Sequence, residues 1–317
     1  MNLTRFASDL ARVLPEGLTP GEPLALAVSG GPDSTALLWL AAHAFPGQVA
    51  AATVDHGLRP EAAAEAKLAA ANCAALNVPH ATLRPETPIL GGNLHAAART
   101  ARYARLARWA EDLGARVLAT AHHADDQAET FLMRAVRGSG PAGLAGVRQR
   151  RADGPLTVVR PLLTWRRAEL AAIAKAAGLP VALDPSNADE RFERARVRRA
   201  LAEQPWLDPA GLAAAARHVG EAERALADMV DWLWRTRAVA AEAELTLDVA
   251  DLPRELRRRL ARRAVATIQP GFDPATNVEA LLDTLEGGRA AMQADVLAAP
   301  RGALWRFSKA PPRRAAR

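Results

Sequence analysis

The chain has 317 residues, half of them apolar, a formal net charge of +6 and a single cysteine. This length is enough for about two domains, and no apolar stretch approaches the roughly 18 residues of a membrane-spanning helix. One thiol, Cys73, excludes an internal disulfide and any cluster held by cysteines of this chain alone. We therefore expect a reducing, cytoplasmic environment, no membrane partner and, from the basic excess, an anionic partner.

Short β-type runs alternate with helical patterns through the first part of the chain. The runs are 24–28, 49–54, 80–83 and 116–121, and the segments between them carry apolar residues at helical spacing. The alternation predicts an α/β fold with a doubly wound, mostly parallel sheet, whose ligands lie at the carboxyl ends of the strands.

The pattern changes after about residue 208, where the chain becomes mainly helical. Two strand-like stretches near the C-terminus can pair as a hairpin. We predict two domains, 1–208 with an arginine-rich helical end and a smaller, mainly helical domain at 209–317.

The stretch LALAVSGGPDSTALL at 24–38 places two glycines between a buried strand and a helix. Such a turn lets backbone N–H groups and the helix N-terminus face an anion. Unlike a Walker loop, it has no lysine. The alternative is a plain tight turn with Ser34 or Asp33 as helix N-cap. We predict a phosphate-binding loop made of Ser29, Gly30, Gly31, Pro32, Asp33, Ser34 and Thr35.

Asp33 is the one acidic residue of this loop. Its carboxylate repels a phosphate unless a divalent cation lies between the two. The loop therefore predicts Mg²⁺ at Asp33 together with a nucleotide.

SGGPDS resembles the S-G-G-x-D-S loop of the PP-loop ATP pyrophosphatases. These enzymes split ATP between the α- and β-phosphates, so their loop holds the departing pyrophosphate and needs no Walker lysine. The resemblance implies a Rossmann-like PP-loop ATPase fold, with ATP and Mg²⁺ as cofactors.

Within that superfamily the chain resembles the tRNA(Ile)-lysidine synthetases. The matching strings are VDHGLRPEAAAEA at 54–66, NLHAAARTARYARL at 93–106, ATAHHADDQAETFLMRAVRGSGPAGLAG at 119–146, RPLL at 160–163 and DPSNADERFERARVR at 184–198. The resemblance implies an ATP-dependent ligase that adenylates the wobble cytidine of a tRNA(Ile) with a CAU anticodon. Lysine then displaces AMP, which gives lysidine. One departure is Ala195, where the family's pattern leads us to expect asparagine.

The resemblance also implies roles for individual residues. Asp126 and Glu129, on one face of a helix that starts near 124, bind the two ammonium groups of lysine; the alternative is that they only interact with the helix dipole. His122 lies at the ATP end. Either His122 or Asp126 accepts the proton of the lysine ε-amine.

The expected roles fall into three sets. The catalytic set is His122, Asp126 and Asp33. Val54 joins the loop residues in the nucleotide site. The substrate set is Asp126, Glu129, Arg99, Asn187, Arg194 and Arg196, although a solvated helix face is the alternative for Arg99.

Two segments are rich in arginine, RFERARVRR at 191–199 and PRELRRRLARR at 253–263. Such a density of charge repels itself unless an anion covers it. An RNA backbone is the cover we expect, with a steep dependence of binding on salt; a solvated helical face is the alternative, more so for the second segment. We expect four tryptophans in the core, namely Trp206, Trp232, Trp234 and Trp305. We expect His123 to be structural or solvated.

Two other functions stay open from the sequence. One is a PP-loop ligase that acts on a small metabolite and needs no RNA. The other is a non-catalytic nucleotide- or RNA-binding module, which turnover of ATP would exclude. Whether the chain forms a homodimer is also left open.

Overall fold

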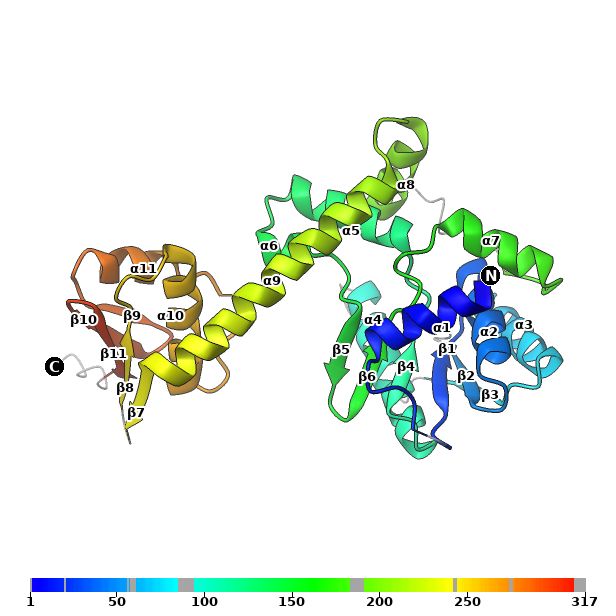
Figure 1. The fold of residues 1–317 in the computed structure, drawn as a ribbon, viewed down its shortest axis with the longest axis horizontal. Helices are drawn as coiled ribbons and strands as arrows, with labels where there is room; N and C mark the ends of the chain where they lie inside the picture. Colours follow the sequence, from blue (N-terminus) through cyan, green and yellow to red (C-terminus); the bar gives the residue numbers. More distant parts are fainter. Residues whose placement is uncertain are drawn as a thin grey trace. The chain divides into compact units, whose positions relative to one another are not determined.

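The computed structural model describes residues 2–19, 21–55, 57, 61–84, 94–182, 191–241, 244–273 and 276–310. They form two compact units, 1–220 and 221–317, and Figure 1 shows the elements of each. Helix α9 (Pro209–Arg237) begins at the predicted domain boundary and runs through residue 220. In the described part of the chain, no helix is long and apolar enough to cross a membrane.

A six-stranded sheet with the order β3-β2-β1-β4-β6-β5 forms the centre of the first unit. Every pairing is parallel except that of β5 with β6. The strands are β1 (Leu24–Ala27), β2 (Val49–Val54), β3 (His80–Leu83), β4 (Val117–Ala119), β5 (Arg150–Asp153) and β6 (Leu156–Val159). The predicted doubly wound, mostly parallel sheet is confirmed, and the antiparallel β5–β6 hairpin extends it beyond the four predicted strands.

The two faces of this sheet bury different side chains. Strand β1 turns Leu24 and Leu26 to one face, where they pack with α1 (Asn2–Val13), α2 (Pro32–Ala44), α3 (Ala62–Ala75) and α7 (Arg167–Ala176). The small Ala25 faces the other side, together with residues of α4 (Leu94–Asp112). Because successive strand residues point to opposite faces, the run LALA serves both layers.

The order of the strands indicates where on the sheet a ligand would bind. The chain leaves β1 for β2 and β3 on one side and then returns to β4 on the other side. Ligands of open α/β sheets bind where the strand order reverses in this way, outside the carboxyl ends of the strands. The loop at 28–31 follows β1 and the segment at 120–123 follows β4 and leads into α5 (Ala124–Val136), so both arrive at this point.

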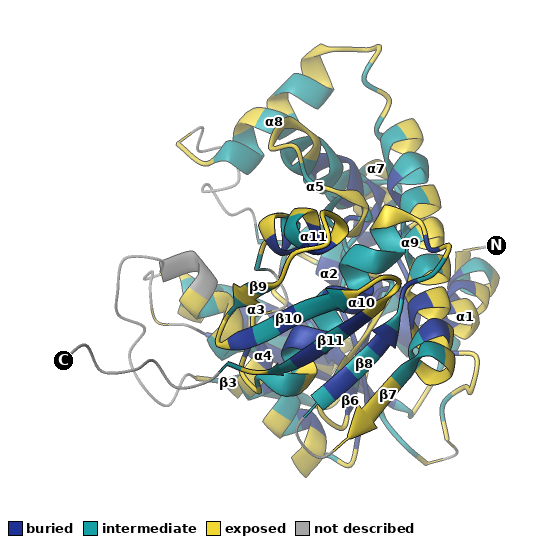
Figure 2. Cartoon of the chain, turned by 90° about the vertical axis from the view of Figure 1, so that its left-hand side faces the viewer, coloured by how far each residue is buried: buried dark blue, intermediate teal, exposed yellow. Residues whose placement is uncertain are grey.

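The second unit combines helices with a five-stranded antiparallel sheet of order β7-β8-β11-β10-β9. Its core is formed by the inner face of the sheet and by apolar residues of the helices; in Figure 2, β8, β10 and β11 carry dark blue, buried segments. The elements are β7 (Ala238–Ala241), β8 (Glu244–Asp248), α10 (Arg254–Ile268), α11 (Glu279–Glu286), β9 (Ala291–Gln293), β10 (Val296–Arg301) and β11 (Leu304–Lys309). Strands β10 and β11 pair as the hairpin expected near the C-terminus.

The four tryptophans expected in the core do not share one environment. Trp305 is buried in the second unit, and Trp234 packs against the same core. The prediction is wrong for Trp206 and Trp232, whose side chains are 76% and 51% exposed. Trp206 lies in the turn after α8 (Glu193–Glu203), where its indole N–H donates to Gln204 Oε1 at 3.1 Å.

Candidate functional site

The phosphate loop connects β1 to α2 through Gly30 and Gly31. Gly30 has a φ of +82°, and a Cβ at this position would lie 3.2 Å from the carbonyl oxygen of Glu65, so only glycine fits without strain. Gly31 is the N-cap of α2, with no side-chain cap bond. The alternative in which Ser34 or Asp33 caps the helix is therefore wrong, and the first N–H groups of α2 are left for an anion.

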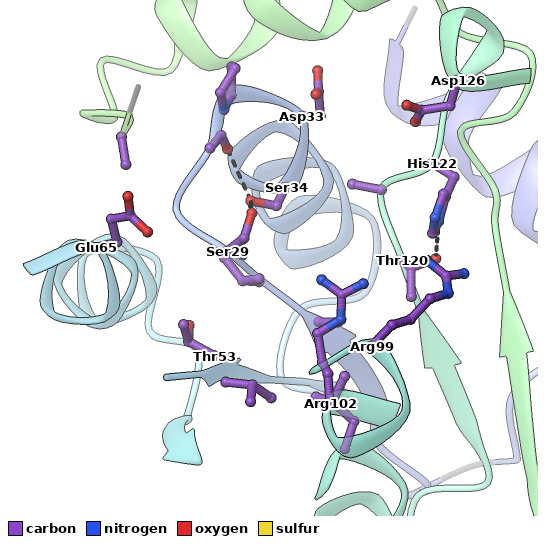
Figure 3. Close-up of a pocket in the computed structure, with 18 of the residues that line it drawn as sticks. Ser29, Asp33, Ser34, Thr53, Glu65, Arg99, Arg102, Thr120, His122 and Asp126 are labelled. Carbon is purple, nitrogen blue, oxygen red and sulfur yellow. Dashed lines mark hydrogen bonds between the residues drawn. The ribbon is translucent and has the colours of Figure 1, made fainter. Parts of the chain in front are cut away.

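Two serine hydroxyls shape the loop from inside. Ser34 Oγ donates to the carbonyl oxygen of Gly31 at 3.0 Å and accepts from the backbone N–H of Ser29 at 3.1 Å. The hydroxyl oxygens of Ser29 and Ser34 are 3.2 Å apart (Figure 3). Thr35 is fully buried, with its hydroxyl toward the carbonyl of Gly30. Ser29 and Ser34 are thus the hydroxyls of the loop that can reach a ligand.

A cavity of about 690 Å³ opens beside this loop. Predicted residues that line it are Ser29, Gly31, Pro32, Asp33, Ser34, Val54, Arg99, His122, Asp126 and Arg194. Predicted residues outside the lining are Gly30, Thr35, Glu129 and Arg196, while Asn187 lies outside the described residues. Segments distant in sequence therefore meet in one cavity.

Arginines supply the positive charge that the loop lacks. Five of them line the cavity, namely Arg99 and Arg102 from α4, Arg167 from α7, and Arg194 and Arg198 from α8. Figure 3 shows Arg99 and Arg102 projecting from α4 into the same space that Ser29 and Ser34 face. A phosphate-rich ligand at the loop is therefore surrounded by guanidinium groups, which suit phosphate oxygens.

Glu129 holds three of these arginines and is only 1% exposed. Its Oε1 lies 3.0 Å from Arg167 Nη2 and 2.8 Å from Arg198 Nε, and its Oε2 lies 2.9 Å from Arg194 Nε. Burial alone raises the pKa of Glu129, but the hydrogen bond from Arg198 and the three positive charges outweigh it and hold the pKa below its usual range. Both carboxylate oxygens are thus engaged by arginine.

Asp126 lies one helical turn before Glu129 and faces the cavity instead. Its Oδ2 accepts a hydrogen bond from the backbone N–H of His123 at 3.1 Å, which fixes the side chain in the first turn of α5. Its Oδ1 is 3.9 Å from Arg194 Nη2. Of the two carboxylates predicted to bind lysine, Asp126 is the one that lines the cavity.

His122 also lines the cavity, and its surroundings favour the neutral form of the ring. Its Nδ1 is 2.9 Å from the hydroxyl of Thr120, which follows β4 (Figure 3). Burial, and then the positive charges of Arg160, Arg99, Arg102 and Arg194, hold the pKa of His122 well below its ordinary value. An imidazole in this setting forms hydrogen bonds but takes up a proton with difficulty.

Asp33 is the acidic residue of the phosphate loop, and one of its oxygens has no partner among the described residues. Asp33 Oδ1 is buried without a hydrogen bond, while Oδ2 is 3.4 Å from His123 Nε2. The described residues contain no group of three or more metal-binding side chains. Magnesium commonly binds through one carboxylate plus substrate phosphates, so this arrangement fits Mg²⁺ carried by a nucleotide.

Several cavity residues were not assigned a role from the sequence. Thr53 and Thr120 lie at or just after the carboxyl ends of β2 and β4. Because ligands of parallel sheets bind at these ends, their position in the sequence could have indicated a place in the site. Arg167 and Arg198 also line the cavity. No local pattern marks Arg167, and Arg198 is marked only as one member of the arginine-rich segment 191–199; both reach the cavity because of where α7 and α8 lie beside α5.

Many arginines of the two arginine-rich segments form ion pairs with carboxylates of the protein itself. On α8, Arg194 and Arg198 pair with Glu129, and Arg199 lies 3.6 Å from Glu203. On α10, the arginines pair with acidic residues of the same unit; the pairs are Arg254 with Glu279, Asp283 and Glu286, Arg257 with Glu286, Arg258 with Glu255 and Glu279, Arg259 with Glu223 and Glu255, and Arg263 with Asp231. Protein carboxylates therefore neutralise part of the positive charge of both segments.

Known proteins match the chain over almost its whole length. The model of a PP-loop domain matches residues 2–205. A tRNA(Ile)-lysidine synthase of Novosphingobium aromaticivorans is 44% identical over 318 residues, 99% of this chain and 95% of that protein. A tRNA(Ile)-lysidine synthase of Zymomonas mobilis subsp. mobilis is 44% identical over 303 residues, 92% of this chain and 90% of that protein.

A solved structure shares the fold. It is the U34-tRNA thiolase NcsA from Methanococcus maripaludis with its 4Fe–4S cluster, which matches with a TM-score of 0.54 and 18% identity and covers 68% of this chain and 78% of that chain. This chain has one cysteine, Cys73, and it is buried in α3. Ligation of a cluster by several cysteines is therefore not available within this chain.

The buried thiol of Cys73 is expected to be unreactive in the folded protein. Burial raises its pKa to about 12, so the thiolate that reacts with disulfide reagents is scarce at neutral pH. We expect a thiol-specific chromogenic disulfide to react slowly with the native chain and to titrate one thiol rapidly after denaturation. Rapid reaction of the native chain would show that Cys73 is accessible and would contradict its burial in α3.

Proposed function

The chain belongs to the tRNA(Ile)-lysidine synthase family, and we propose that it joins lysine to the wobble cytidine of a tRNA(Ile) with a CAU anticodon. The products are lysidine, AMP and pyrophosphate. The observation that carries the proposal is that the phosphate loop and the carboxylate of Asp126 line the same cavity. That cavity can hold a nucleotide at one side and a cationic amine at the other.

The proposed reaction has two steps, adenylation of the base and displacement of AMP by lysine. The cytidine O2 attacks the α-phosphorus of ATP, and pyrophosphate leaves with the bridging oxygen. The lysine ε-amine then attacks C2 of the adenylated base, loses a proton, and AMP leaves with the former O2. Adenylation thus converts a poor leaving group into a good one.

The phosphate loop and the arginines stabilise the charge that develops in the first step. Backbone N–H groups at the start of α2 and the hydroxyls of Ser29 and Ser34 face the departing pyrophosphate. Arg167, Arg194 and Arg198 add positive charge from α7 and α8. When Mg²⁺ is bound, Asp33 holds it, and it neutralises charge on the phosphates.

Asp126 is the residue we assign to the lysine amine. Its carboxylate lines the cavity and attracts the ammonium group. It accepts the proton that the amine loses during the attack. His122 is less suited to that task because its pKa is held well below the ordinary value by burial and by four arginines. We assign His122 to a neutral hydrogen bond at the ATP end.

The tRNA has to present its target base to this cavity. A base in the anticodon stack cannot reach the reacting atoms, so it is turned out of the stack. Arg99 and Arg194 line the cavity and are assigned to phosphate or base contacts; Asn187 and Arg196 keep the substrate-binding role that the family resemblance implies. The proposed location is the cytoplasm, where the substrate tRNA occurs.

A direct assay tests the proposal. An unmodified transcript of the CAU-anticodon isoleucine tRNA is incubated with ATP, Mg²⁺ and labelled lysine, and AMP release and lysine incorporation are followed together. We expect both with this transcript and neither with the initiator methionine tRNA, which has the same anticodon. AMP formation without any RNA would favour a small-metabolite ligase, and a lack of AMP under all conditions would favour a non-catalytic binding module.

Binding of the tRNA is expected to weaken steeply with salt. Arg196 is exposed on α8 and lies outside the cavity lining, so we assign its guanidinium to the RNA backbone. Arg196→Ala should lower tRNA affinity several-fold and reduce the slope of log K against log salt concentration by about one, with little change in KM for ATP. Filter binding at several salt concentrations measures this.

A matched substitution controls for loss of charge alone. Arg12→Ala removes one arginine of α1 that pairs with Asp9 and does not line the cavity. We expect its salt slope to equal that of the wild type. Equal slopes for both variants would show that Arg196 makes no phosphate contact.

A further inference from the structure

His123 is buried between the phosphate loop and the first turn of α5. Its side chain is 1% exposed, and it is the N-cap of α5. The backbone N–H of Asp126 donates to His123 Nδ1 at 3.4 Å. In the neutral ring that accepts this bond, the proton is on Nε2.

The protonated side of the ring faces two carboxylates. His123 Nε2 lies 3.4 Å from Asp33 Oδ2 and 3.5 Å from Asp126 Oδ2. One buried side chain therefore touches the acidic residue of the phosphate loop and the carboxylate assigned to lysine. The expectation of a structural or solvated His123 omitted this contact with Asp33, which is 90 residues away in the sequence.

The contact between His123 Nε2 and Asp33 Oδ2 sets the orientation of the Asp33 carboxylate. With Oδ2 toward His123, the other oxygen, Oδ1, is buried and has no hydrogen-bond partner among the described residues. An unpartnered buried carboxylate oxygen costs free energy unless a ligand engages it. The 3.4 Å contact between His123 Nε2 and Oδ2 also limits rotation of the carboxylate, so Oδ1 keeps one direction.

We propose that His123 is a positioning residue that orients the Asp33 carboxylate, through Nε2–H and Oδ2, so that Oδ1 receives the divalent cation of the bound nucleotide. The inference rests on the proposed function, because that function supplies the metal–nucleotide complex. It adds a residue that carries no part of the chemistry. His123 acts on the metal through Asp33 and does not touch the reacting atoms.

Two amide substitutions separate the two contacts of the ring. In His123→Asn, the amide oxygen takes the place of Nδ1 and keeps a favoured N-cap, but no donor reaches Asp33. In His123→Gln, the longer amide brings a donor close to the position of Nε2 and gives up the short N-cap acceptor. The pair therefore removes the metal-orienting contact and the helix cap one at a time.

The measurement is binding of Mn²⁺ by electron paramagnetic resonance, in the presence of a non-hydrolysable ATP analogue and without tRNA or lysine. We expect His123→Asn to weaken Mn²⁺ binding about tenfold, equivalent to about 1.4 kcal/mol, with an unchanged Tm. We expect His123→Gln to bind Mn²⁺ within about threefold of the wild type and to lose about 2–4 °C in Tm, as for loss of a cap. Equal Mn²⁺ affinity of His123→Asn and wild type would overturn the inference.

A second measurement uses only the wild-type chain, so it does not depend on the variants folding. Nitrogen-15 NMR of the histidine rings at mildly alkaline pH reports which nitrogen of His123 is protonated. We expect the Nε2–H form; the Nδ1–H form has no proton to give to Asp33 and contradicts the inference. If the wild type fails to bind the metal–nucleotide complex at all, the proposed function itself fails, whereas binding without His123 dependence removes this inference alone.

Discussion

Asp126→Asn is expected to lower kcat/KM for lysine by about 10²–10⁴-fold, the usual contribution of a positioned proton acceptor. Asparagine has the same size, and its amide oxygen can still accept the hydrogen bond from the backbone of His123 that Asp126 Oδ2 accepts at 3.1 Å. Only the charge is lost. The ammonium group then loses its partner in the cavity wall, and the amine has no carboxylate to take its proton.

A lysine-independent assay separates this effect from damage to the ATP site. Exchange of labelled pyrophosphate into ATP, in the presence of tRNA and without lysine, reports the adenylation step, and we expect Asp126→Asn to change it only a few-fold. The matched control is Asp125→Asn, in the same helical turn. Asp125 accepts from Arg166 and from the backbone N–H of Arg167 and does not line the cavity. Equal losses in both variants would mean that Asp126 acts through helix stability.

Glu129→Gln is expected to lower the free energy of unfolding by about 3 kcal/mol, as for removal of one partner from a buried ion pair. Glu129 is 1% exposed and engages Arg167, Arg194 and Arg198. A neutral amide leaves three guanidinium groups close together without their counter-charge. We therefore expect α8 to lose its attachment to α5, and activity to fall with it. Chemical denaturation and hydrogen exchange of α8 measure the two effects.

The matched control for Glu129 is an exposed ion pair between the same two helices. Arg137 at the end of α5 pairs with Glu193 of α8, and Glu193→Gln should cost less than about 1 kcal/mol, as exposed pairs do. The result also tests the lysine-binding role that the family resemblance implies for Glu129. A raised KM for lysine with unchanged stability would show that Glu129 binds lysine directly.

The contribution of Glu129 should depend on pH in a defined direction. The pKa of Glu129 in the folded chain is lower than its ordinary value, so the native state binds fewer protons than the unfolded state. The stabilisation is therefore fully present above an unfolded pKa of about 4.3 and is lost as the pH falls through the folded pKa. We expect the stability difference between wild type and Glu129→Gln to shrink below about pH 4.3 and to stay constant above it.

Contiguous motifs were read correctly because strand, turn and helix follow one another directly in the chain. Residues 24–38 form a strand, a glycine turn and a helix as predicted. The double glycine between two apolar runs predicts a tight turn, and Gly30 has the left-handed φ that such a turn can require. The four predicted β-type runs are strands of one sheet, and alternation with helices was sufficient to indicate their parallel order.

Side chains that bridge distant segments were read incompletely. The sequence predicts a shared role for Asp126 and Glu129 because they lie three positions apart on one helix. The structure turns Asp126 to the cavity and Glu129 to three arginines of α7 and α8. Similarly, no local signal indicated that Trp206 is exposed or that His123 touches Asp33.

The α/β sheet, the phosphate loop and the family resemblance could all be predicted from the sequence, since each depends on residues close together in the chain. The sequence pointed to Arg99 and Arg194 as cationic site residues, and the packing of the helices adds Arg102, Arg167 and Arg198 to them. The loop has no lysine, and five arginines from α4, α7 and α8 line the cavity in its place. The tertiary structure alone decided which carboxylate is free for substrate, because a carboxylate is held or free according to the cations packed against it, and those cations come from helices up to 69 residues further along the chain.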